Sequence, residues 1–471
     1  MIDELPAAPG SDAERVKYVL DESEIPTAWY NIVADLPEAP PRPLHPRTHE
    51  PMTAAEMGSL SAQELLRQDG STQRYIEIPD EVRRVYRQWR PSPLYRARRL
   101  ERVLGTPARI YYKYEGVSPT GSHKTNTAVP QVYYNRLEGI LKLTTETGAG
   151  QWGTALAFAC SQFGVECEVF WAGISFDQKP FRKLMMDTYG ATVHRSPSAV
   201  TAVGRKELAN DPTSYGSIGL AVSEAVEIAL ANEDTGYALG STAGHVLLHQ
   251  TVIGEEAIRQ FELAEDYPDL VISCVGGGSS LGGLGFPFLR ENLTRGRQTG
   301  ILAVEPTACP ALTRGRYAWD YGDKEGLTPL MKMYTVGHAF IPEPIHAGGL
   351  RYHGMSPLVS YVRNLGYVDA VAKSQRECFA AGLEFARAEG IVAAPESTHG
   401  LAACVEEARR CAATGEEKAI LVLVTGHAHF DLAAYDAFLN GTMADPELTE
   451  AQLESFLGQL PVVHEPRPGA V

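Results

Sequence analysis

From about residue 95 to residue 445, short apolar runs rich in β-branched residues alternate with longer amphipathic stretches. The runs LKLTT (141–145), DLVISCV (269–275) and AILVLV (419–424) have the length and composition of buried strands. Each is followed by a polar or glycine-rich loop and then by a segment with helical period. Strands that alternate with helices in this way are typical of parallel sheets covered on both faces, so the pattern predicts an α/β fold.

The first 90 residues depart from this pattern because they are rich in proline and charge. Within them, PEAPPRPLHPR (37–47) predicts an extended connector, so we expect an N-terminal arm. A chain of 471 residues, 44% of them hydrophobic, can bury two ordinary cores. We therefore expect two domains behind the arm.

The loops after the three strands carry candidate chemistry. The first, ETGAGQWG (146–153), precedes a predicted helix at 154–163 that Gly164 should end; the others are GGGSSLGG (276–283) and TGHAHFD (425–431). A glycine-rich loop at a helix start presents free N–H groups to an anion, and ligands of open α/β sheets bind at the carboxyl ends of the strands. Two anion sites beside a third polar loop favour a phosphorylated cofactor with an amino-acid substrate.

Charge narrows the choice of partner. The formal net charge of −16 leaves no sizeable basic surface, which argues against nucleic acid or an anionic membrane and favours small molecules. The N-terminus, MIDELPAAPGSDAERV, lacks the basic and apolar regions of a signal peptide, and no long apolar run occurs, so we expect a cytoplasmic protein. Seven cysteines without a C-x-x-C pair indicate reduced, mostly buried thiols, and we predict no metal site.

Two nucleotide motifs are matched only in part. GVSPTGSHK (116–124) has two glycines at P-loop spacing, but Ser122 stands where that motif requires lysine. The loop GGGSSLGG overlaps a dinucleotide fingerprint without a convincing acidic partner for the ribose. The lysine of GSHKTN, Lys124, instead precedes AVPQVYYNRL, where Pro130 predicts that a helix begins or kinks.

Four strings in order resemble the tryptophan synthase beta chain: YEGVSPTGSHKTN (114–126), ETGAGQWG, CVGGGSS (274–280) and HAGGLRYHG (346–354). Trp152, LRYHG and HVLLHQTVIGEEA (245–257) are similar to the second, less-studied subtype. The resemblance covers about residues 90 to 445. It implies a fold-type II enzyme: two α/β domains, each with a mostly parallel sheet flanked by helices, and pyridoxal 5'-phosphate bound between them.

The resemblance also implies roles for the matching positions. Lys124 would hold the cofactor as a Schiff base and move protons, and Glu146 would help the β-hydroxyl leave and orient indole. Removing Cα–H and expelling a poor leaving group do require one amine base and one carboxyl acid. Around the cofactor would lie His123, Gly276, Gly277, Gly278, Ser279, Ser280, Glu396 and Thr425. The substrate carboxylate would bind Thr147, Gly148, Ala149, Gly150 and Gln151.

Several positions allow a second interpretation. Thr425, expected at the pyridine nitrogen, could instead cap the next helix, and Glu396 could be a helix-start carboxylate. His245 and His249 have helical spacing but no acidic neighbour in the sequence, which favours packing or proximity to the cofactor over metal binding. Among the other candidates, His427 and His429 could line the site, and Cys404 and Cys411 should share one core face.

Departures from the family pattern concern the substrate. Ser280, Thr425 and Ala428 stand where asparagine, serine and glycine are common. Arg351 lies near the place where the main subtype has the aspartate that receives the serine hydroxyl. An arginine there would suit an anionic leaving group such as phosphate, so serine is not assured as the donor.

We therefore expect a lyase that joins L-serine, or an O-activated serine, to indole and releases tryptophan. The alternatives are a serine or threonine deaminase, β-replacement with another nucleophile, and, remotely, a beta-like subunit without turnover. The resemblance implies a homodimer, and an alpha-subunit partner is doubtful. The resemblance also implies a division of the chain. An arm with the start of the N-terminal domain (1–90) is followed by a segment crossing into the C-terminal domain (90–122) and by the N-terminal domain (123–265), which includes a mobile segment (138–226). The C-terminal domain (266–445) and a tail (446–471) complete the chain.

Overall fold

Two sheets organise the computed structural model, which describes residues 15–57 and 61–463. The larger has seven strands in the order β1-β4-β5-β15-β10-β11-β14. The last five in this order run parallel to one another, whereas β4 is antiparallel to both of its neighbours, β1 and β5. Their bounds are Lys17–Tyr18 (β1), Leu94–Arg96 (β4), Arg109–Tyr114 (β5), Ala419–Val424 (β15), Leu270–Cys274 (β10), Gly300–Pro306 (β11) and Asp369–Lys373 (β14). Strands β4 and β5 thus join a sheet built mostly from the C-terminal half.

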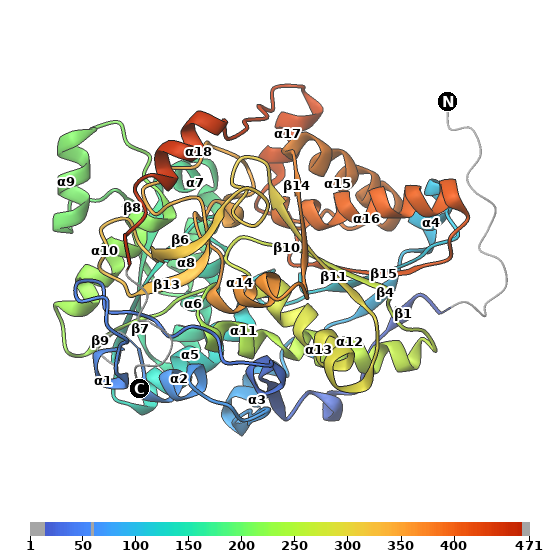
Figure 1. Cartoon of the computed structure of the whole chain (residues 1–471), viewed down its shortest axis with the longest axis horizontal. Helices are drawn as coiled ribbons and strands as arrows, with labels where there is room; N and C mark the ends of the chain where they lie inside the picture. The colour runs from blue at the N-terminus through green and yellow to red at the C-terminus, as the bar shows by residue number, and fades with distance from the viewer. Residues whose placement is uncertain (1–14, 58–60, 464–471) are drawn as a thin grey trace.

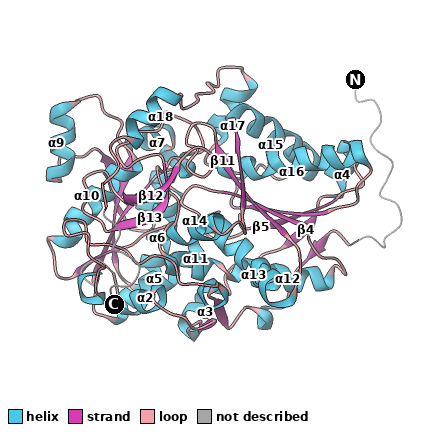
Figure 2. Cartoon of the chain, in the orientation of Figure 1, coloured by secondary structure: helices cyan, strands magenta, loops and turns pink. Residues whose placement is uncertain are grey.

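The smaller sheet has four strands in the order β8-β7-β6-β9, all parallel. Their bounds are Thr192–Ser196 (β8), Glu166–Ala172 (β7), Lys142–Thr147 (β6) and Thr235–Tyr237 (β9). Helices α6 (Gln151–Phe163) and α10 (Ile218–Leu230) pack on it. Figure 2 shows both groups of strands enclosed by helices, which confirms the predicted α/β class.

Helices cover both faces of the larger sheet (Figure 1). On one face lie α4 (Arg98–Leu104), α15 (Gln375–Glu389) and α16 (Pro395–Thr414), and on the other α12 (Val252–Leu263) and α13 (Ser279–Arg295). Apolar strand residues such as Ile272 and Val422 are fully buried against the first group. Cys404 and Cys411 belong to that same cluster, as predicted, and all seven cysteines are buried free thiols.

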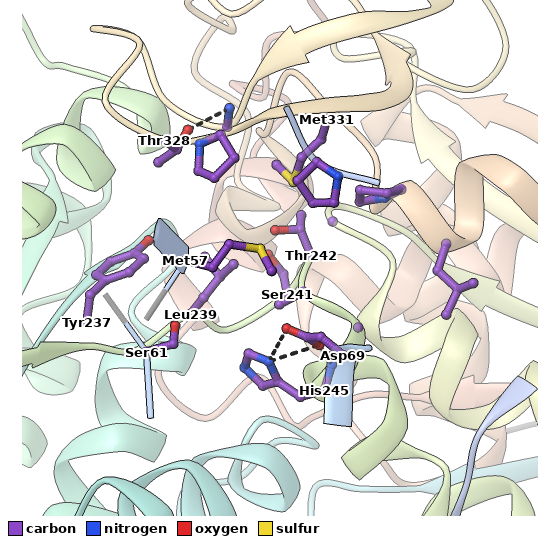
Figure 3. A pocket seen from close by; sticks show the side chains of 18 of the residues that line it. Met57, Ser61, Asp69, Tyr237, Leu239, Ser241, Thr242, His245, Thr328 and Met331 are labelled. Carbon is purple, nitrogen blue, oxygen red and sulfur yellow. Dashed lines mark hydrogen bonds and ion pairs between the residues drawn. The ribbon is translucent and has the colours of Figure 1, made fainter. Parts of the chain in front are cut away.

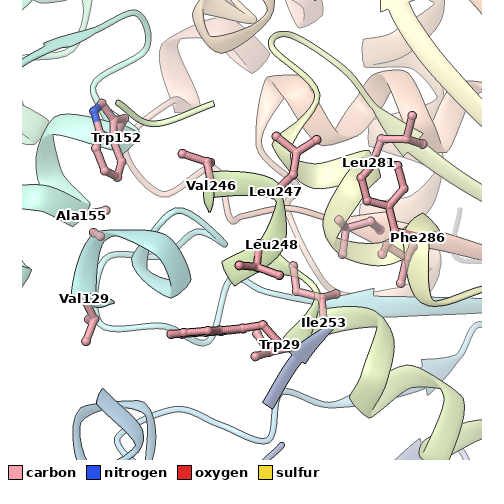
Figure 4. Close-up of a cluster of buried hydrophobic side chains, with 14 of the residues drawn as sticks. Trp29, Val129, Trp152, Ala155, Val246, Leu247, Leu248, Ile253, Leu281 and Phe286 are labelled. Atoms are coloured by element: carbon pink, nitrogen blue, oxygen red, sulfur yellow. The ribbon is translucent and has the colours of Figure 1, made fainter. Parts of the chain in front are cut away.

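The N-terminal arm packs into the core. It contains β2 (Ala28–Tyr30), α2 (Gln63–Asp69), β3 (Tyr75–Glu77) and α3 (Asp80–Tyr86), whereas 37–47 has neither helix nor regular strand and touches β13 (Leu330–Thr335) through a single bridge at Leu44. Trp29 of the arm is buried among side chains of α11 (Gly244–Gln250), as Figure 4 shows. The arm is therefore part of the folded body.

Helix α5 (Thr125–Leu137) begins directly after Lys124 and runs through Pro130, where the sequence had predicted a start or a kink. Proline lacks the N–H that would bond the carbonyl of Asn126, four residues earlier. The Tyr86 hydroxyl of the arm donates to that carbonyl instead. A partner distant in the sequence thus satisfies the group that proline leaves unbonded.

Other boundaries also differ from the prediction. Helix α6 begins at Gln151 instead of residue 154, and α13 begins at Ser279, so the two serines belong to a helix and not to the preceding loop. Residues 446–471 are not only a tail, because α18 (Glu450–Leu457) buries Leu453 and Leu457 beside Val336. The predicted C-terminal cap at Gly164 is confirmed.

The remaining elements complete the chain. They are η1 (Glu22–Glu24), η2 (Ile32–Asp35), α1 (Ala54–Met57), α7 (Gly173–Gln178), α8 (Pro180–Thr188), α9 (Ala202–Asn210), β12 (Arg316–Tyr321), η3 (Gly348–Leu350), α14 (Pro357–Asn364) and α17 (Leu432–Leu439). Over residues 15–57 and 61–463, no helix combines the length and apolar character needed to cross a membrane. Residues 1–14, which carry most of the stretch examined for a signal peptide, lie outside the described part.

Candidate active site

Lys124 and Glu146 line one cavity of about 1020 Å³ between the two sheets. The Lys124 Nζ donates to the carbonyl of Gly240 at 2.7 Å and lies 3.3 Å from the Ser279 Oγ. Burial lowers the pKa of the Lys124 amine to about 8. Near physiological pH this amine is therefore neutral in a far larger fraction than an ordinary lysine, and the neutral form is the one that acts as a base or nucleophile.

The loop before α13 forms a narrow cradle. A Cβ on Gly276 would lie 2.2 Å from the carbonyl oxygen of Gly349, and one on Gly277 would lie 2.5 Å from the Ser241 Oγ. Only glycine fits there, so the backbone N–H groups at the start of α13 stay accessible to an anion. The Ser279 Oγ completes the cradle beside the Lys124 amine.

His123 and Ser280 have different environments around this cradle. The Nε2 of His123 lies 3.2 Å from the Ser279 Oγ, and burial together with the nearby Lys124 charge lowers the pKa of His123 to about 3. His123 is therefore neutral and acts as a hydrogen-bonding group. The Ser280 hydroxyl donates to the carbonyl of Cys274 at 2.6 Å and so holds the helix start to β10.

The loop predicted to bind the substrate carboxylate lies at the end of β6. Glu146 and Thr147 are its last residues, and α6 starts at Gln151 without a side-chain cap at its N-terminus. The Thr147 Oγ1 accepts from the N–H of Gly153 at 3.2 Å, and the Gln151 Nε2 donates to Glu396 at 3.0 Å. These side chains have other partners and none of them caps α6, so the first backbone N–H groups of the helix lack a side-chain acceptor, as a carboxylate site requires.

Glu396 and Thr425 are buried and do not themselves line the cavity, although Glu396 bonds to Gln151 and Gly349, which do. Glu396 is in the first turn of α16, which confirms the helix-start position, and it accepts from the N–H of Gly349 at 3.0 Å. The Thr425 Oγ1 pairs with the Ser397 Oγ at 2.8 Å. It does not cap α17, whose N-cap residue is Asp431.

Glu146 is buried, and the Tyr237 hydroxyl donates to its Oε2 at 2.6 Å. Burial raises the pKa of the Glu146 carboxyl to about 7, and this hydrogen bond opposes the rise. Tyr237 belongs to none of the motifs, and no sequence signal pointed to it. An amine and a carboxyl that both titrate close to neutral pH thus face one cavity.

Arg351 is buried but is not one of the residues that line this cavity. Its Nη2 lies 3.5 Å from the Ser175 Oγ, and its Nε has no hydrogen-bond partner within the described ranges. Burial lowers the pKa of the guanidinium to about 10.

The histidine pair of α11 does have an acidic neighbour, contrary to the expectation. Asp69 of α2 accepts from the His245 Nδ1 at 3.0 Å (Figure 3), and Gln68 bonds the His249 Nε2 at 2.8 Å. The acid was missed because it lies 176 residues away in sequence. Within the described residues, no group of three or more His, Cys, Asp or Glu is arranged to hold a metal.

His427 packs against Gly121, His429 is exposed, and neither lines the cavity. The arm supplies much of the outer wall instead. The arm residues Met57 and Asp69 line the cavity together with Leu239, Ser241 and Thr242, as Figure 3 shows. The sequence contained no signal for this contribution.

Comparisons with known proteins agree with this geometry. The family model described as pyridoxal-phosphate dependent enzyme matches residues 85–426. The tryptophan synthase beta chain 2 of Methanosarcina mazei is 53% identical over 430 residues, which cover 91% of this chain and 97% of that protein. The protein of the same name from Aquifex aeolicus is 54% identical over 432 residues, covering 91% and 100%.

Solved structures show the same fold at low identity. The fungal L-serine ammonia-lyase from Rhizomucor miehei aligns with a TM-score of 0.56 and 18% identity, covering 75% of this chain and 98% of that one. The threonine deaminase of T.th. aligns with a TM-score of 0.50 and 20% identity, covering 74% and 97%.

Proposed function

This chain belongs to the family of pyridoxal-phosphate dependent enzymes, alongside the proteins named tryptophan synthase beta chain 2, and from that membership we propose the roles of its own residues. The reaction is the β-replacement that converts L-serine and indole to L-tryptophan and water. The observation that carries the assignment is one cavity with Lys124 and Glu146 on its wall, beside the starts of α6 and α13, neither of which has a side-chain cap.

The cradle before α13 and the neutral His123 would hold the phosphate of the cofactor, and the loop 147–151 would hold the substrate carboxylate. When bound, pyridoxal 5'-phosphate supplies the electron sink that stabilises negative charge at the substrate Cα. Lys124 removes the Cα proton, for which its lowered pKa of about 8 is suited. Thr425, a neutral hydroxyl paired with Ser397, would be the partner of the pyridine nitrogen and would not fix a proton there.

Glu146 serves both halves of the reaction. Its protonated carboxyl gives a proton to the departing β-oxygen, so that the C–O bond breaks and water leaves. Its carboxylate then accepts a hydrogen bond from the indole N–H. A pKa of about 7 makes both forms available near neutral pH.

Residues 138–226, within an N-terminal domain (123–265), form a mobile segment that closes the site and excludes water. The site lies between that domain and a C-terminal domain (266–445), which also takes in residues 90–122. Contacts of this segment with the C-terminal part support the proposal. The Ser223 Oγ donates to Asp323 at 2.7 Å, and Lys179 pairs with Asp431 at 2.7 Å. Exclusion of water protects the reactive intermediate from hydrolysis.

The test is to incubate the cofactor-loaded protein with serine, with and without indole, and to measure tryptophan and pyruvate. Tryptophan formed only with indole supports the proposal. Pyruvate at the same rate with and without indole would identify a deaminase, and no product would indicate a beta-like subunit without turnover.

The donor class is a separate proposal. Arg351 lies behind the cavity wall, and its Nε has no hydrogen-bond partner among the described residues. If its side chain reaches the β-substituent when substrate binds, it would suit an anionic one, so O-phosphoserine should exceed serine in kcat/KM and Arg351→Ala should remove most of that preference. If Arg351 only stabilises the closed state through Ser175, both donors should lose activity equally.

The assembly proposed is a cytoplasmic homodimer that works without an alpha-type subunit. Light scattering of the purified protein should give twice the mass of the chain. Addition of an alpha-type subunit should leave the rate of tryptophan formation unchanged.

A further inference from the structure

Tyr237 ends strand β9, and its side chain points into the cavity beside Leu239 and Ser241 (Figure 3). In the parallel pairing of β9 with β6, Tyr237 lies opposite Thr144. Thr144 and Glu146 share one face of β6 because side chains alternate along a strand. The register of two strands therefore brings the phenol to the Glu146 carboxyl, 91 residues away in sequence.

Among the described side chains, the Glu146 carboxyl has one close partner, and its own backbone N–H also bonds to it. The Tyr237 hydroxyl is 2.6 Å from Oε2, whereas the next group, the Thr145 hydroxyl, is 3.5 Å away. No described side chain bonds to Oε1. Since Glu146 lines the cavity and the Tyr237 contact occupies Oε2, Oε1 is the oxygen that the described side chains leave to a substrate.

The other titratable groups that face the pair leave this arrangement intact. The Lys124 amine acts on Glu146 only through its charge, and Asp323 and Tyr352 act on Tyr237 in the same way. The Tyr352 hydroxyl is already committed to the carbonyl of Gly322 at 2.6 Å.

We propose that Tyr237 is a positioning residue that holds Oε2 of Glu146 in both protonation states, so that Oε1 alone exchanges the proton with the reacting groups. The phenol donates to Oε2 of the carboxylate, and it can equally donate to the carbonyl oxygen Oε2 of an acid that carries its proton on Oε1, so the contact survives in either state. This inference rests on the acid role proposed for Glu146.

The proton balance is simple. The proton passes from Oε1 to the departing β-oxygen, the C–O bond breaks with its electron pair on that oxygen, and the product is water. Negative charge then appears on the carboxyl, and the donated hydrogen bond becomes charge-assisted and stronger. Tyr237 keeps its own proton, because burial and the Glu146 charge raise the pKa of its phenol well above the ordinary value.

Removing the Tyr237 hydroxyl should change the pKa of Glu146 in a definite direction. A hydrogen bond to the carboxylate favours the charged form, so its loss should raise the pKa of Glu146. The protonated acid would then persist to higher pH, and the alkaline limb of serine β-elimination should move upward by about one pH unit, a tenfold change in the equilibrium constant. A more acidic phenol, as in 3,5-difluorotyrosine at position 237, is a stronger donor and should move the limb the opposite way.

The test is infrared difference spectroscopy of the loaded protein over a pH series. The C=O stretch of the protonated Glu146 is identified by its absence from Glu146→Gln, and its titration requires no turnover. Tyr237→Phe should shift that titration upward. The matched control is Tyr30→Phe, which removes another buried phenol–carboxylate bond, 2.8 Å to Asp35, and should leave the titration in place.

Superimposed titrations for wild type and Tyr237→Phe, with an active wild type, would overturn this inference alone. Absence of both tryptophan and pyruvate from the wild type would instead remove the proposed function. If Tyr237→Phe does not fold, the fluorinated protein decides the question, because a shift toward lower pH supports the positioning role and an unshifted titration refutes it.

Discussion

Around the cavity, burial shifts the pKa values of three side chains, two downward and one upward. It lowers the pKa of Lys124 to about 8 and that of His123 to about 3, and it raises the pKa of Glu146 to about 7. Desolvation always disfavours the charged form, so amines and imidazoles become less basic and carboxyls less acidic. A neutral base and a protonated acid can thus coexist at one pH, as an elimination requires.

Lys124→Ala should abolish the visible absorption of covalently held cofactor and stop turnover, because Lys124 is the lysine that lines the cavity within the described residues. Spectra of the purified proteins after addition of the cofactor test this. Lys183→Ala, at an exposed ion pair on α8, is the control and should keep the wild-type spectrum. An unchanged spectrum in Lys124→Ala would refute the assignment.

Ser279→Ala should weaken cofactor binding by about 1 kcal/mol, roughly fivefold in Kd, through loss of one hydrogen bond. Ser280→Ala should have the smaller effect on binding, because its hydroxyl bonds the Cys274 carbonyl. Fluorescence titration of each variant with the cofactor measures both. Wild-type affinity in both variants would place the phosphate elsewhere.

At the scale of the elements, α2 of the arm supplies the N-terminal cap that α11 lacks. The N-cap residue of α11, Ala243, has no side-chain acceptor, and Asp69 of α2 accepts from the His245 backbone N–H and from its ring. The adjacent Gln68 bonds His249, which in turn contacts Thr127 of α5. A chain of buried polar contacts thus connects the arm to the helix that follows Lys124.

Asp69→Ala should destabilise the protein by about 1 kcal/mol, the usual effect of losing an N-cap. Asp69→Asn should lose less, because it keeps an oxygen that can accept from the backbone N–H. Urea unfolding followed by tryptophan fluorescence measures the difference. The control is Asp80→Ala, at an exposed pair with Arg83, and a loss as large there as at Asp69 would contradict the capping role.

At the scale of the whole molecule, a buried ion-pair cluster joins the segment 138–226 to the C-terminal part. Asp431 contacts Lys179 at 2.7 Å and Arg182 at 2.5 Å, and all three side chains are almost fully buried. The two cations hold the pKa of Asp431 well below its usual range. The stabilisation from this carboxylate is therefore fully present above its unfolded pKa of about 3.9 and is lost only as the pH falls through the lower folded value.

Asp431→Asn would leave two buried cations without their counter-charge, a change that typically costs about 3–5 kcal/mol. The contact between the two parts of the chain should loosen and admit water, so the ratio of pyruvate to tryptophan should rise. Product analysis by chromatography measures this ratio. Asp187→Asn, at an exposed pair on the same α8, should leave the ratio unchanged, and an equal rise there would refute the closure role.

The sequence by itself determined the features that depend on short stretches of chain. Strand β15 begins and ends where its apolar run does, and Lys124, Glu146 and the glycine cradle lie within motifs of a few residues. Tertiary structure alone decided the rest: the Tyr86 hydroxyl at the Asn126 carbonyl, the Asp69 cap of α11, the arm along the cavity, and Tyr237 against Glu146. Each of these joins residues tens to hundreds of positions apart. Periodicity and motif spacing report only neighbours along the chain, whereas strand register and helix packing decide which distant groups meet.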